Sequence, residues 1–96
     1  MKKFIRLDNI FAQESTTYIR LEDIKELIHY EYRHSANKNA LSTSIKLDEG
    51  TVTVSLEQYL EIASQLLDDA DFTNLRQWLF CKGYVKESPT GEYLDD

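Results

Sequence analysis

The chain has few of the residues that punctuate or staple a fold: its 96 residues include one cysteine, one proline and three glycines. A single cysteine, Cys81, cannot form an internal disulfide, so nothing favours an oxidising compartment. Three glycines leave little for a phosphate-binding loop, and the common glycine-rich and metalloprotease motifs are missing. No stretch approaches the roughly 18 apolar residues of a membrane-spanning helix. We therefore expect a cytoplasmic protein without disulfide, cofactor or membrane segment.

Charge is plentiful but unevenly distributed. Residues 1–47 contain eight Lys or Arg and six Asp or Glu, whereas residues 48–96 contain three and eleven, and the formal net charge is −6. Such polarity is typical of a solvated acidic surface, and it also fits contact with a basic partner or head-to-tail self-association. The acidic half is poorly suited to phosphate backbones, so the composition disfavours nucleic acid as a partner.

The hydrophobic period changes from two to about three and a half between residues 48 and 70. Asp-Glu-Gly at residues 48–50 is typical of a tight turn, and Thr51–Val54 alternates as a strand does. Ser55 and Gln58 have the spacing of a capping box at the start of a helix. The apolar stripe that follows has helical spacing and comprises Leu56, Tyr59, Leu60, Ala63, Leu66, Leu67 and Ala70. These patterns predict a long helix over residues 56–70, directly after a strand.

A second, shorter helix is predicted over residues 73–82. Gly83 follows it, at the position where helices commonly end in a left-handed residue. The last residues include the only proline and are mostly polar or acidic. We expect a single domain over residues 1–85 and a flexible acidic tail over residues 86–96.

The first half alternates between apolar and polar residues, as strands do. Strands are predicted over residues 3–8, 16–21, 27–34 and 41–47, the last of which forms a hairpin with residues 51–54. A helix over residues 22–34 is the competing interpretation, but the alternation of aromatic residues favours a strand. The fold class is therefore α+β, with a mostly antiparallel sheet of about five strands and both helices packed on one face.

Few residues are candidates for chemistry. His29 and His34 are the only histidines, and at five residues apart on a strand they point to opposite faces, so they cannot readily share a metal. Cys81 has no neighbouring base in the sequence, which favours a small hydrophobic role over that of a nucleophile. The acidic run at residues 68–71 lacks the glycine and glutamate that a calcium-binding loop needs. We predict no catalytic, cofactor-binding or metal-binding residues and do not expect an enzyme.

Tyrosines on the predicted strands suggest an interaction surface, because tyrosine offers a large contact area at a low entropic cost. The candidate surface comprises Tyr18, Arg20, Tyr30, Tyr32 and Arg33. The alternative is that the tyrosines cover the core beneath the helices, since the apolar helix stripe must pack on some face of the sheet.

Two bacterial families have a similar order of motifs. Phe-Ile-Arg-Leu at residues 4–7, Tyr-Ile-Arg-Leu-Glu-Asp-Ile at residues 18–24, a strand pair and Val-Ser-Leu-Glu at residues 54–57 resemble small flagellar FlbD-type proteins over residues 3–67. That resemblance implies no enzymatic activity. A weaker similarity to LytTR-type DNA-binding domains rests on the same Tyr-Ile step and on Asp71-Phe72. It implies DNA binding, but the basic strand of that family is replaced by Thr-Asn-Leu-Arg-Gln, so no contact residue carries over.

The sequence therefore favours a small, non-catalytic protein-interaction or regulatory module of bacterial or phage-like origin. We expect its partner to be another protein or a second copy of the chain, in a dimer formed through a sheet edge or the tyrosine-bearing face. The alternative function is a nucleic-acid-binding regulator that uses the basic half of the sheet. Its candidate residues are Lys2, Lys3, Arg6, Arg20, Lys25, Arg33 and Lys38.

Overall fold

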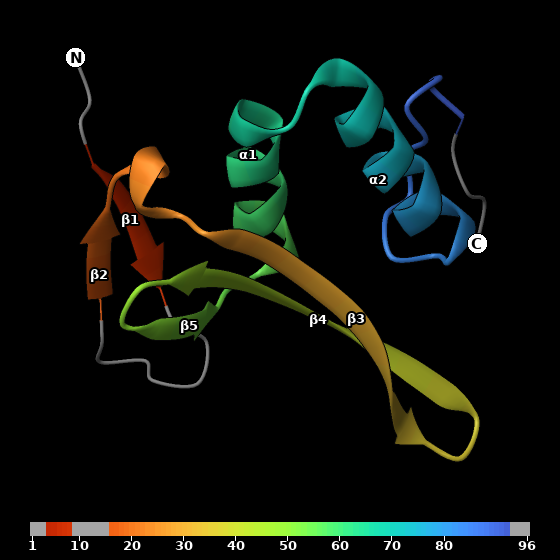
Figure 1. Ribbon diagram of the computed structural model, residues 1–96. Coiled ribbons are helices and arrows are strands. Elements are labelled where there is room, and N and C mark those ends of the chain that lie inside the picture. Colours follow the sequence, from red (N-terminus) through yellow and green to blue (C-terminus); the bar gives the residue numbers. More distant parts are fainter. Residues whose placement is uncertain (1–3, 9–15, 93–96) are drawn as a thin grey trace. The chain divides into compact units, whose positions relative to one another are not determined.

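The computed structural model describes residues 4–8 and 16–92 and divides the chain into two compact units, residues 1–62 and residues 63–96. The strands of the first unit are β1 (Ile5–Asp8), β2 (Thr16–Ile19), β3 (Glu26–Ser35), β4 (Lys38–Leu47) and β5 (Gly50–Thr53), with a short 3₁₀ helix, η1 (Leu21–Asp23). Helix α1 (Leu56–Leu66) begins in the first unit and ends in the second, which also holds α2 (Asp69–Cys81) (Figure 1). The α+β class is confirmed.

The five strands form two antiparallel sheets, so the prediction of one five-stranded sheet is wrong. Strands β1 and β2 pair only with each other among the described residues, with Ile5 opposite Ile19 and Asp8 opposite Thr16. The second sheet has the order β3-β4-β5.

A side chain of α1 bonds the backbone of β1, which gives a physical reason for the separation. Gln58 Nε2 donates to the carbonyl oxygen of Arg6, and the backbone N–H of Asp8 donates to Gln58 Oε1 at 3.4 Å. Here the helix side chain supplies partners that a neighbouring strand would otherwise supply.

Strands β3 and β4 form a long hairpin of ten residues each (Figure 1). Segment 27–34 is therefore a strand, as predicted, and the helical alternative is wrong. A register shift lies between Arg33 and Ser35, close to the turn. The turn from β4 into β5 uses Gly50 with a φ of 151°, the positive angle that glycine allows at little cost.

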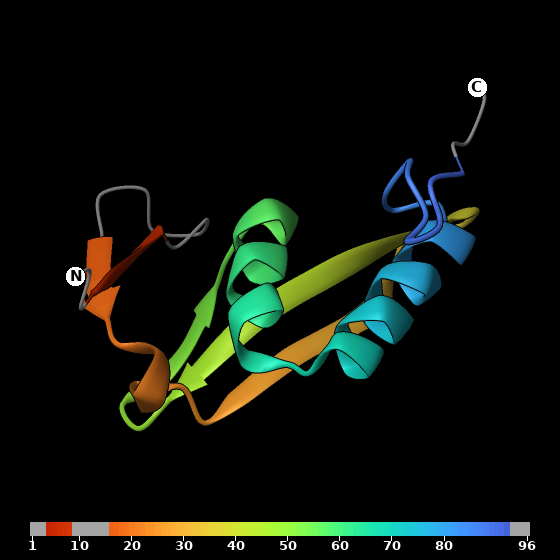
Figure 2. The ribbon, with the colours of Figure 1, turned by 90° about the horizontal axis from the view of Figure 1, so that it is seen from above.

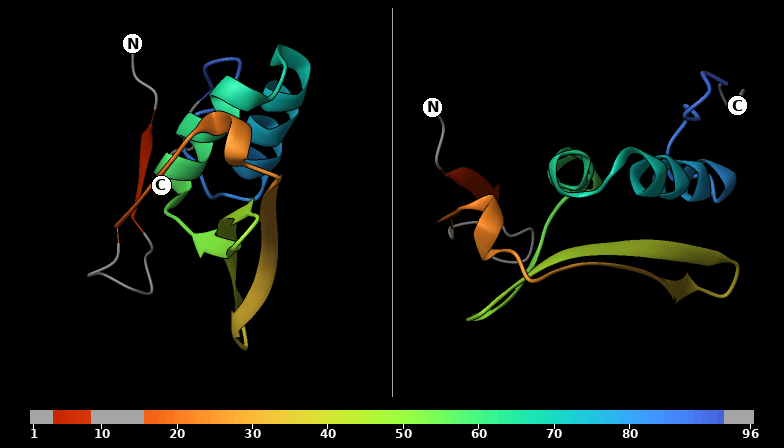
Figure 3. Two further views of the ribbon diagram at one scale, coloured as in Figure 1. Left: turned by 60° about the vertical axis from the view of Figure 1, so that its left-hand side comes forward. Right: turned by 45° about the horizontal axis from the view of Figure 1, so that its top comes forward.

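Helix α1 lies over one face of the three-stranded sheet (Figures 2 and 3). Ser55 caps the start of this helix as predicted, because its hydroxyl accepts a hydrogen bond from the backbone N–H of Gln58 at 3.2 Å. The buried apolar side chains of the first unit are Leu7, Ile19, Ile45, Leu47, Val54, Tyr59 and Ile62. Those of the second unit are Ala63, Leu75 and Leu79. Ser44 on β4 is only 6% exposed, and its hydroxyl lies 3.3 Å from that of Thr53.

The lengths of the two helices differ from prediction. Helix α1 ends at Leu66 after 11 residues, and α2 is the longer one, with 13 residues from Asp69. The carboxylate of Asp68 explains the break, because it accepts the backbone N–H of Asp71 at 2.8 Å and so caps α2. Aspartates that are unfavourable at the end of one helix are favourable at the start of the next.

The second unit continues past α2 into an ordered turn. Gly83 has a φ of 83°, which confirms its predicted place after the helix. The ring of Tyr84 then stacks on Trp78, with centroids 6.2 Å apart. Farther on, the hydroxyl of Ser88 is buried and accepts the backbone N–H groups of Thr90 and Glu92 at 3.2 and 2.9 Å. The expected domain boundary at residue 85 and the packing of α2 on the sheet stay predictions.

Candidate interaction surface

The contact between β3 and α1 identifies the two faces of the three-stranded sheet. Nδ1 of His29 lies 3.0 Å from the hydroxyl oxygen of Tyr59, and their rings meet edge to face with centroids 5.9 Å apart. Odd-numbered residues of β3 therefore face α1, and even-numbered residues face away, because successive side chains in a strand alternate. Tyr30 and Tyr32 consequently do not lie beneath α1. They are 55% and 45% exposed.

The two tyrosines belong to a row of rings. The centroids of Tyr30 and Tyr32 are 6.3 Å apart, and those of Tyr32 and His34 are 6.5 Å apart. Strand geometry spaces alternate residues by about 6.6 Å, so each ring touches the next along one face. The row presents a continuous aromatic surface to solvent.

Opposite this row on β4 are small residues. Ile28 pairs with Ser44, Tyr30 with Ser42, and Tyr32 with Ala40. We call these six positions the outer face: large side chains on β3 stand beside small ones on β4, and none of the six is charged. The alternation of β3 predicted the tyrosines as a surface, but no local pattern pointed to the small residues. Only the cross-strand register, which depends on the hairpin turn and its bulge, brings them together.

The five residues of the predicted surface do not lie together on one face of the structure. Tyr18 is 64% exposed but lies in the other sheet, opposite Arg6. Arg33 lies at an odd-numbered position of β3, so alternation places it on the face opposite the tyrosines. Of the predicted set, only Tyr30 and Tyr32 share a contiguous surface.

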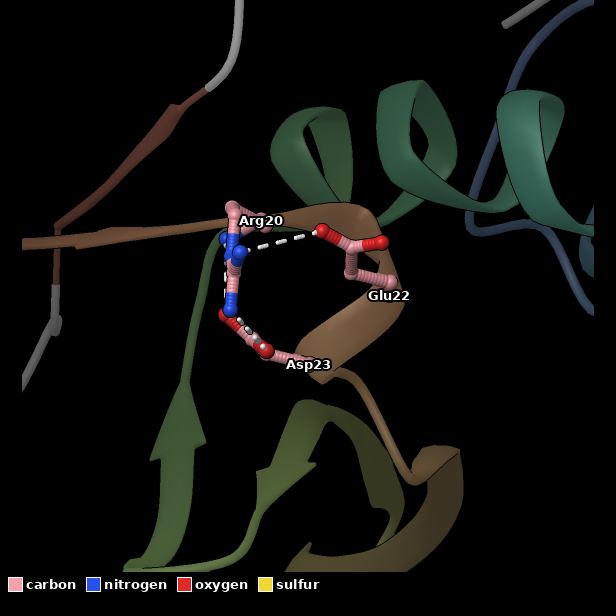
Figure 4. Close-up of polar contacts among 3 residues, drawn as sticks. All are labelled: Arg20, Glu22 and Asp23. Carbon is pink, nitrogen blue, oxygen red and sulfur yellow. Dashed lines mark hydrogen bonds and ion pairs between the residues drawn. The ribbon is translucent and has the colours of Figure 1, made fainter.

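Arg20 is engaged within its own turn (Figure 4). Its guanidinium donates to both carboxylate oxygens of Asp23 at 3.3 Å and pairs with Glu22 at 3.3 Å. The hydrogen bonds from Arg20 hold the pKa of Asp23 below its usual value, and those with Asp23 raise the pKa of Arg20. The cluster is solvent-exposed, so we regard it as local support for η1 and not as a binding site.

The other candidates for chemistry make local contacts within the described residues. Burial raises the pKa of the Tyr59 phenol to about 12, which suits a neutral hydrogen-bonding role beside His29. Cys81 is exposed, and its sulfur accepts a hydrogen bond from Gln77 at 3.3 Å. No group of three or more His, Cys, Asp or Glu within residues 4–8 and 16–92 is placed to hold a metal ion. In the same ranges, none of the helices is long and apolar enough to cross a membrane.

No protein-family model matches the chain, and searches of curated proteins and of solved structures also found no match. The resemblances to FlbD-type proteins and to LytTR-type domains therefore stay predictions.

Proposed function

We propose that this protein is a non-catalytic interaction module that binds a protein partner through the outer face of the β3–β4 hairpin. The observation that carries the proposal is the exposure of Tyr30 and Tyr32 side by side on the face turned away from α1. An exposed large side chain is ordinary when it is isolated, but adjacent aromatics on an uncharged strand face are typical of contact surfaces. Two ordered strands also present this surface with little loss of entropy on binding.

The proposal predicts that the two tyrosines supply most of the binding energy. Removal of a buried aromatic anchor at an interface commonly costs about 2 kcal/mol or more, so the double variant Tyr30→Ala with Tyr32→Ala should reduce partner capture at least about tenfold. Affinity isolation from the native host, followed by mass spectrometry, measures this loss. The matched control is Tyr18→Ala, which removes a tyrosine that is 64% exposed from the other sheet. Equal capture by the double variant and the unchanged protein would contradict the proposal.

Nucleic-acid binding is the second candidate function. The observation that favours it is that residues 32–47 include Arg33, Lys38 and Lys46 but no Asp or Glu. Other members of the predicted basic set have local partners: Arg6 is 3.1 Å from Asp8, Arg20 belongs to the cluster above, and Lys25 is 3.6 Å from Asp48. Lys2 and Lys3 lie outside the described residues. Three of the seven predicted basic residues therefore lie beside a carboxylate, which reduces the positive charge that could contact phosphates.

Salt dependence distinguishes this second candidate from the first. A protein that neutralises several phosphates loses affinity steeply as salt rises, whereas an uncharged aromatic contact does not. We expect no measurable binding of single-stranded or duplex oligonucleotides at 50 mM salt. Tight binding at 50 mM that weakens strongly by 200 mM would instead establish the nucleic-acid function. Fluorescence anisotropy with labelled oligonucleotides makes the measurement.

A further inference from the structure

We infer that the partner of the outer face is a second copy of the same face, in a symmetric dimer. This inference rests on the proposed function and names its partner. The outer face consists of a ridge, formed by Ile28, Tyr30 and Tyr32 on β3, and a trough on β4, formed mainly by Ser42 and Ala40. Ser44 continues the β4 row but is only 6% exposed, so it adds little open surface. Ridge and trough run side by side in register, because each large residue pairs directly with a small one.

This pattern is self-complementary for one orientation of the two copies. A two-fold axis parallel to the strands, between β3 and β4, places the ridge of each copy over the trough of the other. A two-fold axis perpendicular to the strands would instead place ridge on ridge, which leaves the troughs empty. Twisted sheets that pack face to face keep their strands within about 30° of each other, so the two rows stay aligned over these few residues. The interface is isologous, with each contact made twice.

The charged residues at the end of the outer face also favour the two-fold axis parallel to the strands. Glu26 and Lys46 pair across the strands at the end of the outer face, and both are exposed. The axis parallel to the strands brings Glu26 of each copy over Lys46 of the other, so two opposite-charge pairs form at the rim. Such exposed pairs contribute little energy, but they disfavour orientations that bring like charges together.

The size of the surface sets the expected strength. From Glu26 to His34 the strand extends about 27 Å at about 3.4 Å per residue. With two strands about 4.8 Å apart and their side chains, the footprint is roughly 300–400 Å² per copy, compared with about 800 Å² for a standard stable interface. We therefore expect a weak, reversible dimer, because the footprint is smaller than that of a standard stable interface.

Sedimentation equilibrium between about 5 and 500 µM tests the dimer, and an exchange of two paired residues tests its geometry. Tyr30→Ser removes the middle of the ridge and Ser42→Tyr fills the trough beside it, so each single variant should weaken association at least about tenfold. The double variant, Tyr30→Ser with Ser42→Tyr, moves the ridge from β3 to β4 at that level. Because the two-fold relates β3 of one copy to β4 of the other, the double variant is again self-complementary and should recover dimerisation. Tyr18→Ser should leave it unchanged, and circular dichroism should confirm that every variant is folded.

A monomer at 500 µM overturns the inference, and so does a double variant no stronger than the single ones. If the purified protein is monomeric while capture of a host protein still depends on Tyr30 and Tyr32, the self-association is wrong and the proposed function stands. If neither dimerisation nor capture depends on these tyrosines, both are wrong. Salt-sensitive oligonucleotide binding that is lost with the same tyrosines also overturns the dimer, since the face then serves another ligand.

Discussion

Replacing Ile62 by alanine is expected to lower the free energy of unfolding by about 3 kcal/mol, within the range of about 2–5 kcal/mol measured for buried isoleucines. Ile62 is 0% exposed in α1. The loss combines the transfer energy of the removed methyl and methylene groups with the cavity they leave in a packed interior. Against a typical stability of about 5–15 kcal/mol, this is a large fraction for a chain of 96 residues.

Leu66, one turn farther along α1, provides the matched control. It is 40% exposed, so Leu66→Ala should cost no more than about 1 kcal/mol. Urea denaturation followed by circular dichroism gives both values. Equal losses of unfolding free energy in the two variants would show that Ile62 is no more buried than Leu66.

Alkaline conditions are expected to destabilise the protein through Tyr59. Its pKa is raised to about 12 in the folded state because burial disfavours the phenolate, whereas an unfolded tyrosine titrates near its ordinary pKa of 10. The folded state therefore holds the proton more tightly. This contribution is fully present below pH 10 and is lost as the pH rises from 10 towards 12. The shift corresponds to at most about 2–3 kcal/mol of unfolding free energy.

Tyr59→Phe isolates this contribution. At pH 7 the variant should lose about 0.5–1.5 kcal/mol, because His29 loses a hydrogen-bond partner while the buried ring is kept. Between pH 10 and 12 the variant should lose less additional stability than the unchanged protein, since it has no buried phenol to ionise. Urea denaturation at stepped pH measures the difference. Tyr32→Phe, at an exposed position, is the control and should follow the unchanged protein. Parallel losses in all three proteins would contradict the role assigned to Tyr59.

Local sequence patterns predicted the strands and helix ends correctly where a single effect, such as capping or turn formation, decides the local structure. The Asp-Glu-Gly turn, the Ser55 cap and the glycine after α2 all appear in the structure as expected. The errors fall where two rules compete. The acidic run at residues 68–71 is unfavourable at the end of one helix and favourable at the start of another, and the sequence alone does not state which effect prevails.

The separation of the strands into two sheets and the make-up of the candidate surface depend on contacts between residues that are distant in the sequence. Gln58 was assigned to a capping box, but its side chain bonds the backbone of β1, about fifty residues away. Ile62 was omitted from the predicted apolar stripe although it is fully buried. Helical spacing does place Ile62 on the stripe, because it lies three residues after Tyr59 and four before Leu66. The bond from Gln58 to β1 is not visible in local periodicity, because it depends on which strand lies beside α1.

By itself, the sequence determined the α+β class, the face alternation of β3 and the starting residue of α1, since each follows from local spacing, capping and turn chemistry. Only the tertiary structure decided that the strands separate into two sheets, that Tyr30 and Tyr32 face away from α1, and that small residues lie opposite them. Alternation tells which residues share a face but not which face a helix covers. That choice is made when Tyr59 packs against His29 and leaves the tyrosine-bearing face in solvent.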